Sequence, residues 1–220
     1  MELPQRILFV GAHCDDIELF AGGLLARACR TSRAVGVMVF SDHRGVLSDA
    51  DADRARAELA ENLEELARDT GASIEHHSAL WLPACSGAFE SERGRIYAAL
   101  EAVRERYDLV VTHAAGDTNQ DHRQVAEEVR RVFKAHASVL GGEFPANDVG
   151  TFTPEVFVAL TEEDVTRKER MIARYASQRR PGRTYLEEGV ARALARVRGA
   201  QIREPAAEAF EVLARVVVRA

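Results

Sequence analysis

A histidine and two adjacent carboxylates form the first group of residues in this chain that could carry out chemistry. His13, Asp15 and Asp16 follow the apolar residues 7–10, which read ILFV, and precede an apolar pattern of helical spacing. Open α/β sheets bind ligands at the carboxyl ends of their strands. Two neighbouring carboxylates repel each other unless a cation or a shared proton relieves the repulsion. The group therefore predicts a divalent-metal site with His13 and one of the two aspartates as ligands.

A second polar group repeats this arrangement later in the chain. Residues 116–122 read GDTNQDH, come shortly after the strand-like residues 108–113, and lead into another helical pattern. If the two strands are neighbours, His13, His122 and one aspartate converge at one edge of the sheet. Two imidazoles, a carboxylate and a position left for water form a common catalytic zinc site, in which the pKa of the water falls to about 7. The other aspartate then accepts the proton of that water as a general base, and spacing alone does not decide which aspartate is the ligand.

The segments that must position these groups alternate between strand-like and helix-like patterns. Strands are predicted at residues 7–10, 34–40, 72–81, 108–113 and 156–160. Helical patterns begin at Ile17, Ser48 and Thr161 and cover residues 91–107, 125–133 and 186–197. This alternation predicts a single α/β domain over residues 1–220, a doubly wound three-layer sandwich with a mostly parallel sheet.

Composition limits the classes of function that remain. A hydrophobic fraction of 46% and a charged fraction of 29% are those of an ordinary globular protein, and the net charge of −6 argues against general nucleic-acid binding. The three cysteines show no paired spacing; they are Cys14, Cys29 and Cys85. We therefore expect no disulfide framework and a location in the reducing cytoplasm. No segment resembles a signal peptide or approaches the roughly 20 apolar residues of a membrane span. The expected partner is a small molecule rather than a nucleic acid or a membrane.

The two polar groups resemble the paired motifs of the LmbE/PIG-L N-deacetylases. Residues 12–18, AHCDDIE, are similar to the first motif, and residues 117–123, DTNQDHR, are similar to the second. Residues 198–201 and 207–210, RGAQ and AEAF, resemble the ending of the branch that deacetylates N-acetylglucosaminyl-malate. The resemblance implies a Rossmann-like fold and zinc-dependent hydrolysis of N-acetyl groups on amino-sugar compounds. Another divalent metal such as Fe²⁺ suits the same ligands.

The resemblance also assigns roles to individual residues. It implies that His13, Asp16 and His122 hold the metal. It further implies that Asp15 is the general base. The competing interpretation, polar loop residues that only cap helices, is disfavoured because both motifs are present. Cys14 stands where the family usually has a proline, and we interpret it as a small residue filling the turn. The resemblance leaves room for a homo-oligomer.

The chain departs from the family's pattern at Asn119. Many members have a histidine there, three residues before the metal-binding histidine, which is implied to stabilise the oxyanion or to protonate the leaving amine. An amide can donate a hydrogen bond to an oxyanion but cannot transfer a proton. The proton is then returned by Asp15, or it comes from His43 or His113, which also follow strands. The sequence leaves these routes open.

Candidate substrate-binding residues follow the strand-like residues 34–40. His43 and Arg44 lie in the loop there, and the guanidinium of Arg44 could bind an anionic substrate group through two hydrogen bonds. A solvated loop charge is the alternative for Arg44. The basic loop at residues 179–183 is a second segment that could border the site, although charged runs usually face solvent.

The sequence thus predicts a zinc-dependent enzyme that releases acetate from an N-acetylated small molecule, an amino sugar or a glycoside. One alternative is an amidase that acts on another acyl group or on a thiol conjugate. Another is a metal-binding homologue without catalysis. A nucleotide-binding Rossmann module is disfavoured, because the first loop lacks the G-x-G-x-x-G pattern and its aspartates would repel a pyrophosphate.

Overall fold

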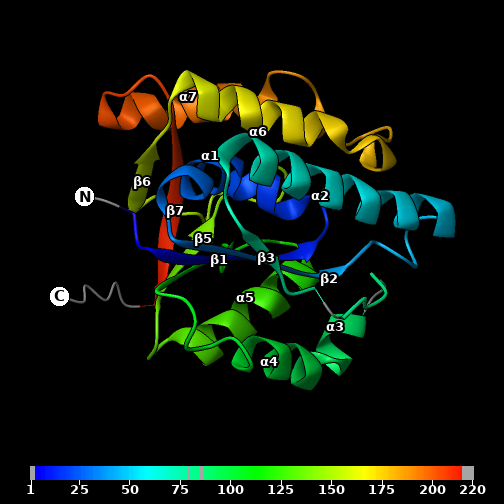
Figure 1. Ribbon diagram of the computed structural model, residues 1–220. Helices are drawn as coiled ribbons and strands as arrows, with labels where there is room; N and C mark the ends of the chain where they lie inside the picture. The colour runs from blue at the N-terminus through cyan, green and yellow to red at the C-terminus, as the bar shows by residue number, and fades with distance from the viewer. Residues whose placement is uncertain (1–2, 79, 85–86, 215–220) are drawn as a thin grey trace.

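A seven-stranded sheet lies at the centre of the computed structural model, which describes residues 3–78, 80–84 and 87–214 (Figure 1). The strands are β1 (Arg6–His13), β2 (Ala34–Ser41), β3 (Ile74–His76), β4 (Leu109–His113), β5 (Ser138–Gly142), β6 (Val156–Ala159) and β7 (Ala207–Ala214). Their order is β3-β2-β1-β4-β5-β7-β6; the first five pair in parallel, and β7 is antiparallel to both its neighbours. The order 3-2-1-4-5 is that of a doubly wound sheet. The predicted α/β fold with a mostly parallel sheet is confirmed.

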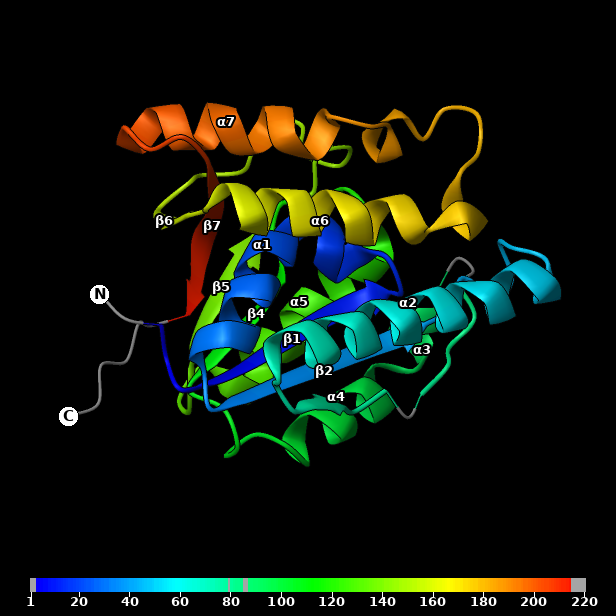
Figure 2. The same ribbon diagram turned by 45° about the horizontal axis from the view of Figure 1, so that its top comes forward.

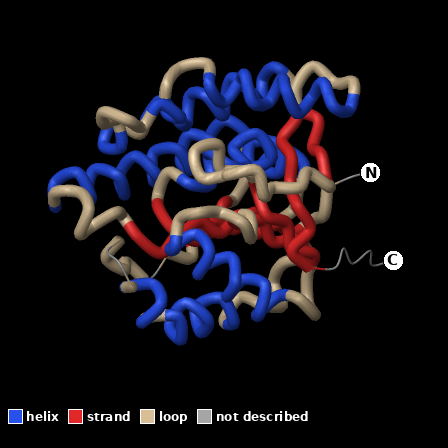
Figure 3. Tube along the Cα trace, turned by 180° about the vertical axis from the view of Figure 1, so that it is seen from behind, coloured by secondary structure: helices blue, strands red, loops and turns tan. Residues whose placement is uncertain are grey.

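Helices cover both faces of this sheet. They are α1 (Asp16–Thr31), α2 (Asp49–Thr70), α3 (Ala88–Ser91), α4 (Arg93–Glu101), α5 (Gln120–Phe133), α6 (Glu162–Arg174) and α7 (Val190–Ile202). Helices α1, α2, α6 and α7 lie on one face and α3, α4 and α5 on the other (Figures 1 and 2). Seen from behind, the strands lie between these two helical layers (Figure 3). None of the described helices combines the length and the hydropathy that a membrane-spanning segment needs.

Strand β1 is buried on both faces, which explains its continuous apolar run. Ile7 and Phe9 pack into the core beneath α1, whereas Leu8 and Val10 pack into the core beneath α5. A strand with helices on both sides has no polar face, so its sequence does not alternate. Because β1 pairs in parallel with β4, the loops that follow these two strands meet at one edge of the sheet. The expectation that these strands are neighbours is confirmed.

Several element boundaries differ from those predicted. The strand expected over residues 72–81 is confirmed only at β3, which lies at the sheet edge and pairs with β2 alone. In place of one helix over residues 91–107, the structure has the two short helices α3 and α4, and turns follow Glu101. The helix expected over residues 186–197 begins later, because Gly189 has a left-handed φ of 84°. Strands β5 and β7 were not predicted.

Helix α1 is kinked at Ala21, where φ is −147° and ψ is 22°. The backbone N–H groups of Gly23 and Leu24 donate to the carboxylate of Glu208 on β7, at 2.8 and 2.7 Å. Lys168 on α6 donates to the same carboxylate at 2.7 Å, and both charged side chains are buried. We call Glu208, Lys168 and the two N–H groups the kink cluster. It joins the kinked helix to the antiparallel edge of the sheet.

Cys14 and Cys29 are free and buried. Burial is the main cause that raises the pKa of both thiols, and the pKa of Cys29 rises to about 12. Neither is therefore a reactive thiolate at neutral pH. Cys85 lies outside the described residues.

Candidate active site

Asp16 lies among buried imidazoles at the carboxyl edge of the sheet. It is the first residue of α1, directly beyond β1. Its Oδ1 atom is 3.3 Å from Nε2 of His122. Its Oδ2 atom is 3.3 Å from Nδ1 of His13 and 3.2 Å from Nε2 of His113, and it accepts the backbone N–H of His13 at 2.7 Å. The structure thus brings together His13, Asp16 and His122, and adds His113 at the end of β4.

The donor set of His13, Asp16 and His122 fits a divalent metal. One ligand atom from each lies within 4.8 Å of the other two, so a single ion could contact all three. Each imidazole has a carboxylate on its other nitrogen: Asp121 is 3.2 Å from Nε2 of His13, and Asp117 is 2.7 Å from Nδ1 of His122. Metal-binding histidines commonly bond a carboxylate in this way, which fixes the ring and the tautomer.

The carboxylate and the imidazoles of this cluster shift one another's pKa values. Burial alone would raise the pKa of Asp16, but the neighbouring His122, His113 and His13 hold it well below its ordinary value. Burial also opposes the charged imidazoles, yet the surrounding carboxylates together outweigh it. Asp16 and Asp121 raise the pKa of His13 to about 9, and Asp16 and Asp117 raise the pKa of His122 to about 10. The negative potential that retains protons on these rings also attracts a divalent cation, which would displace them.

Asp15 has a different partner from its neighbour. Its Oδ1 atom lies 2.8 Å from Nε2 of His43, which follows β2. Burial tends to raise the pKa of Asp15, but His43 holds it below the ordinary value; burial and then the charge of His13 lower the pKa of His43. Spacing left open which aspartate faces the imidazole pair of His13 and His122. In the structure it is Asp16.

Asn119 caps helix α5 and also lines the cavity described below. Its Oδ1 atom accepts the backbone N–H of Asp121 at 2.9 Å, which is the usual hydrogen bond of a helix N-cap. Asp117 in turn accepts the backbone N–H of Asn119 at 2.8 Å. Because the cap occupies the oxygen, the amide nitrogen Nδ2 is the group that Asn119 can offer to a ligand.

These side chains border a cavity of about 400 Å³. It is lined by His13, Asp15, Asp16, His43, Val46, Ala84, Asn119, Gln120, Asp121, His122, Phe144, Asn147, Arg183 and Tyr185. His113 is fully buried and is not among these lining residues, whereas His43 is. Of the two histidines considered as alternative proton donors, only His43 therefore borders the space that a substrate would occupy.

The structure places Arg44 away from the cavity lining. Its guanidinium bonds to Asp49 at 2.5 Å and to Asp53 at 2.7 Å, both on α2. The cation at the cavity is Arg183, from the basic loop between α6 and α7. Arg183 donates to the side-chain oxygen of the buried Gln178, and no described carboxylate lies within ion-pair distance of it.

Aromatic rings form one wall of the cavity, and no sequence pattern pointed to them. The ring of Phe144 lies 5.1 Å from that of His122 and 5.4 Å from that of Tyr185, in edge-to-face arrangements. Burial raises the pKa of Tyr185 to about 12, so its hydroxyl stays protonated and can donate a hydrogen bond. Phe144 and Arg183 lie in loops and Tyr185 lies in a short 3₁₀ helix, all far from both motifs in the sequence. Of the three, Arg183 belongs to the basic loop at residues 179–183 that the sequence singled out.

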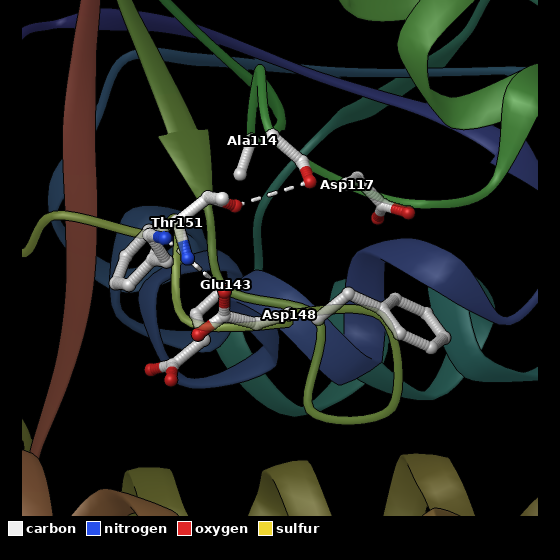
Figure 4. Close-up of a pocket in the computed structure, with 8 residues that line it drawn as sticks. Ala114, Asp117, Glu143, Asp148 and Thr151 are labelled. Carbon is white, nitrogen blue, oxygen red and sulfur yellow. Dashed lines mark hydrogen bonds between the residues drawn. The ribbon is translucent and has the colours of Figure 1, made fainter.

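The loop that carries Phe144 is braced against the second motif. Asp148 accepts the backbone N–H groups of Gly150, Thr151 and Phe152. The hydroxyl of Thr151 donates to the carbonyl of Gly116 at 3.3 Å (Figure 4). A small pocket lined by Ala114 and Asp117, among others, lies between the two loops. This bracing fixes the wall of the larger cavity relative to the second motif, which carries His122.

Comparisons with known proteins agree with this architecture. The model of the family PIG-L, described as GlcNAc-PI de-N-acetylase, matches residues 8–133, more than half of the chain. No curated protein sequence gives a significant match. Among solved structures, the N,N'-diacetylchitobiose deacetylase of Pyrococcus horikoshii, complexed with an inhibitor, superposes with a TM-score of 0.68 at 18% identity, covering 94% of this chain and 83% of that chain.

Two further structures show the range of activities on this fold. The zinc-inhibited form of teicoplanin deacetylase has a TM-score of 0.67 at 17% identity, covering 93% of this chain and 96% of that chain. GalB, the 4-carboxy-2-hydroxymuconate hydratase of Pseudomonas putida KT2440, has a TM-score of 0.72 at 19% identity, covering 100% and 99%. The same fold therefore carries deacetylases and a hydratase, and the activity must be argued from the site.

Proposed function

The chain belongs to the PIG-L family, and from this premise we propose that it is a metal-dependent N-deacetylase that releases acetate from an N-acetylated amino sugar or glycoside. The observation that carries the proposal is the different surroundings of two adjacent aspartates. Asp16 faces the imidazoles of His13 and His122, whereas Asp15 bonds only to His43 among the described residues. One carboxylate is thus available to a metal and the other to a proton.

His13, Asp16 and His122 would hold the metal, which we propose to be zinc; Fe²⁺ accepts the same ligands. When bound, such an ion lowers the pKa of water and polarises a carbonyl group. Asp121 and Asp117 keep the two imidazoles oriented through their outer nitrogens. These carboxylates also stabilise the tautomers in which the inner nitrogens are free to bind the ion.

Asp15 is the general base in this proposal. Its Oδ2 atom accepts a proton from the attacking water as the water oxygen bonds to the acetyl carbon. Nδ2 of Asn119 donates a hydrogen bond to the oxygen that becomes negatively charged. Asp15 then returns the proton to the amide nitrogen as the carbon–nitrogen bond breaks, which yields acetate and a free amine. Asn119 itself carries no transferable proton, so the residue that replaces the family's histidine contributes only the hydrogen bond.

The outer part of the cavity supports a sugar-like substrate. Phe144 and Tyr185 offer ring faces and edges against which the apolar face of a pyranose could pack, and Arg183 and Asn147 offer hydrogen-bond donors. Such a mixture of aromatic surface with a few polar groups is typical of sites for small molecules. The sequence suggested Arg44 as a substrate-binding residue. We propose that Arg183 has this role instead and contacts the part of the substrate beyond the acetamido group.

The test is acetate release from a panel of N-acetylated amino sugars and glycosides, using protein of measured metal content with and without a chelator. We expect release from at least one member, abolished by the chelator and restored by zinc. Bound metal with no acetate release from any member would contradict deacetylation and favour an amidase for another acyl group or a non-catalytic role. Activity that persists in metal-free protein would contradict the metal-dependent mechanism.

A further inference from the structure

His43 has a backbone conformation that few residues adopt easily. Its φ is 65°, and Arg203 is the other non-glycine residue with a positive φ in the described part of the chain. A left-handed conformation is unfavourable for an L-residue, because it brings Cβ too close to the following carbonyl oxygen. Such conformations persist where the surrounding structure fixes them, and they cluster at functional sites.

Contacts on both sides of the residue fix this conformation. The backbone N–H of His43 donates to Oγ of Ser41 at 3.0 Å, and its carbonyl accepts the N–H groups of Val46 and Leu47 at 3.0 and 2.9 Å. The imidazole stacks on that of His13, with ring centres 4.3 Å apart and an interplanar angle of 12°. The side chain is buried, so the ring is held in one orientation.

The ring held in this way contacts Asp15, whose carboxylate has no other hydrogen-bond partner among the described residues. Asp15 stands at the N-cap position of α1, where an aspartate usually accepts a backbone N–H from the first turn. Here its side chain makes no cap hydrogen bond. Its hydrogen bond in the described structure runs to Nε2 of His43, at 2.8 Å. Without that bond, no hydrogen bond among the described residues would fix the orientation of the carboxylate.

We propose that His43 is a positioning residue for Asp15: its Nε2–H holds Oδ1 of the carboxylate so that Oδ2 faces the cavity and the attacking water. The inference rests on the proposed function, in which Asp15 is the base. His43 neither binds the metal nor supplies the proton in this assignment. It differs from the sequence-based prediction that His43 binds the substrate, because a bond to Asp15 affects the chemical step, whereas a substrate contact affects binding.

The first test is His43→Gly. Glycine adopts a φ of 65° without strain, so the loop keeps its conformation while the imidazole is lost. We expect kcat for acetate release to fall about 10–100-fold, the usual cost of losing a group that orients a reacting residue, with KM and metal content unchanged. Free imidazole should restore part of kcat, because the deleted side chain borders the cavity. The matched control, Asp15→Ala, should show no rescue.

A second pair of variants separates the hydrogen bond from the ring. His43→Phe keeps a ring that can stack on His13 but has no N–H donor, and it should be as slow as His43→Gly. His43→Gln keeps an N–H donor at similar reach and should recover part of kcat. Rescue by the donor without the ring is the signature of positioning, since a purely structural role would favour the variant that keeps the ring.

The outcomes that overturn the inference are distinct from those that overturn the function. A His43→Gly variant with normal kcat would show that Asp15 needs no partner. A rise in KM with unchanged kcat would assign His43 to substrate binding instead. Metal loss in His43→Gly would assign it to the support of His13. Wild-type protein that binds metal yet releases no acetate would overturn the proposed function, and the inference with it.

Discussion

Helix α1 contributes to two buried clusters of charged residues, and the clusters differ in the partners that balance their carboxylates. In the kink cluster, the Glu208 carboxylate accepts hydrogen bonds of 2.8 Å from Gly23, 2.7 Å from Leu24 and 2.7 Å from Lys168. At the first turn, the Asp16 carboxylate has imidazole nitrogens at 3.2–3.3 Å and a cavity beside it. The first carboxylate is paired with the ammonium group of Lys168. The second is surrounded by groups that can lose their charge.

This difference separates a structural ion pair from a site for chemistry. An ammonium group beside a carboxylate leaves no need for a metal, because the charge is already balanced and the donors are already bonded. Imidazoles beside a carboxylate can become neutral, and they then offer lone pairs to the same ion that the carboxylate attracts. Substitutions around Asp16 should therefore change metal content and turnover. Substitutions in the kink cluster should instead change stability.

The largest effect is expected from His122→Ala. The variant loses one of the three proposed metal ligands and leaves Asp117 without its imidazole partner. Metal analysis should find the site largely empty, and acetate release should fall to background. Lys168→Gln is the matched control from the kink cluster, and it should retain its metal although its stability falls. Undiminished metal in His122→Ala would contradict the proposed ligand set.

Asp15→Ala tests the division of labour between the adjacent aspartates. Asp15 is proposed as the base and not as a ligand, so metal content should stay stoichiometric while kcat falls about 10²–10⁴-fold, the usual contribution of a general base. Metal analysis and steady-state kinetics on the same preparation separate the two effects. If the variant instead lost its metal, Asp15 would belong to the ligand set.

Glu208→Ala should show the reverse signature. Removing the carboxylate leaves the buried ammonium of Lys168 and two backbone N–H groups without their partner, which costs about 3–5 kcal/mol in the free energy of unfolding. Metal content and kcat per folded molecule should be unchanged. Denaturant unfolding gives the stability, and Glu208→Gln, which keeps an acceptor, should lose less. Equal stabilities of wild type and Glu208→Ala would show that the kink does not depend on this cluster.

The sequence revealed the two clusters to very different degrees. His13, His122 and one of the two adjacent aspartates could be predicted, because they belong to polar segments that follow two apolar strands, and the parallel sheet brings these segments together. The choice of Asp16 came from the family resemblance and not from spacing. The kink cluster could not be predicted. It joins α1, α6 and β7, and the charge of Glu208 interrupts the apolar pattern that would have marked β7 as a strand.

The remaining parts of the site depend on contacts between segments that no local pattern encodes. The pairing of Asp15 with His43 requires β2 beside β1 and a left-handed residue after β2. Arg44 and Arg183 are both loop arginines, and only the tertiary structure shows that carboxylates on α2 hold the first and that the second lines the cavity. Spacing in sequence identified where chemistry was expected but not which neighbours each side chain would have.

The smallest effect is expected from Asn119→His, at a side chain that both caps a helix and borders the cavity. Asn119→His keeps an N–H donor for the oxyanion, so kcat should stay within about tenfold of wild type, whereas Asn119→Ala loses the donor and should fall about 10²–10³-fold. Both variants lose the oxygen that caps α5, which costs about 0.5–2 kcal/mol of stability. Unfolding and kinetics measured side by side separate the two roles. If the histidine and alanine variants were equally slow, Asn119 would act through the helix cap alone and would belong with the kink cluster as a structural residue.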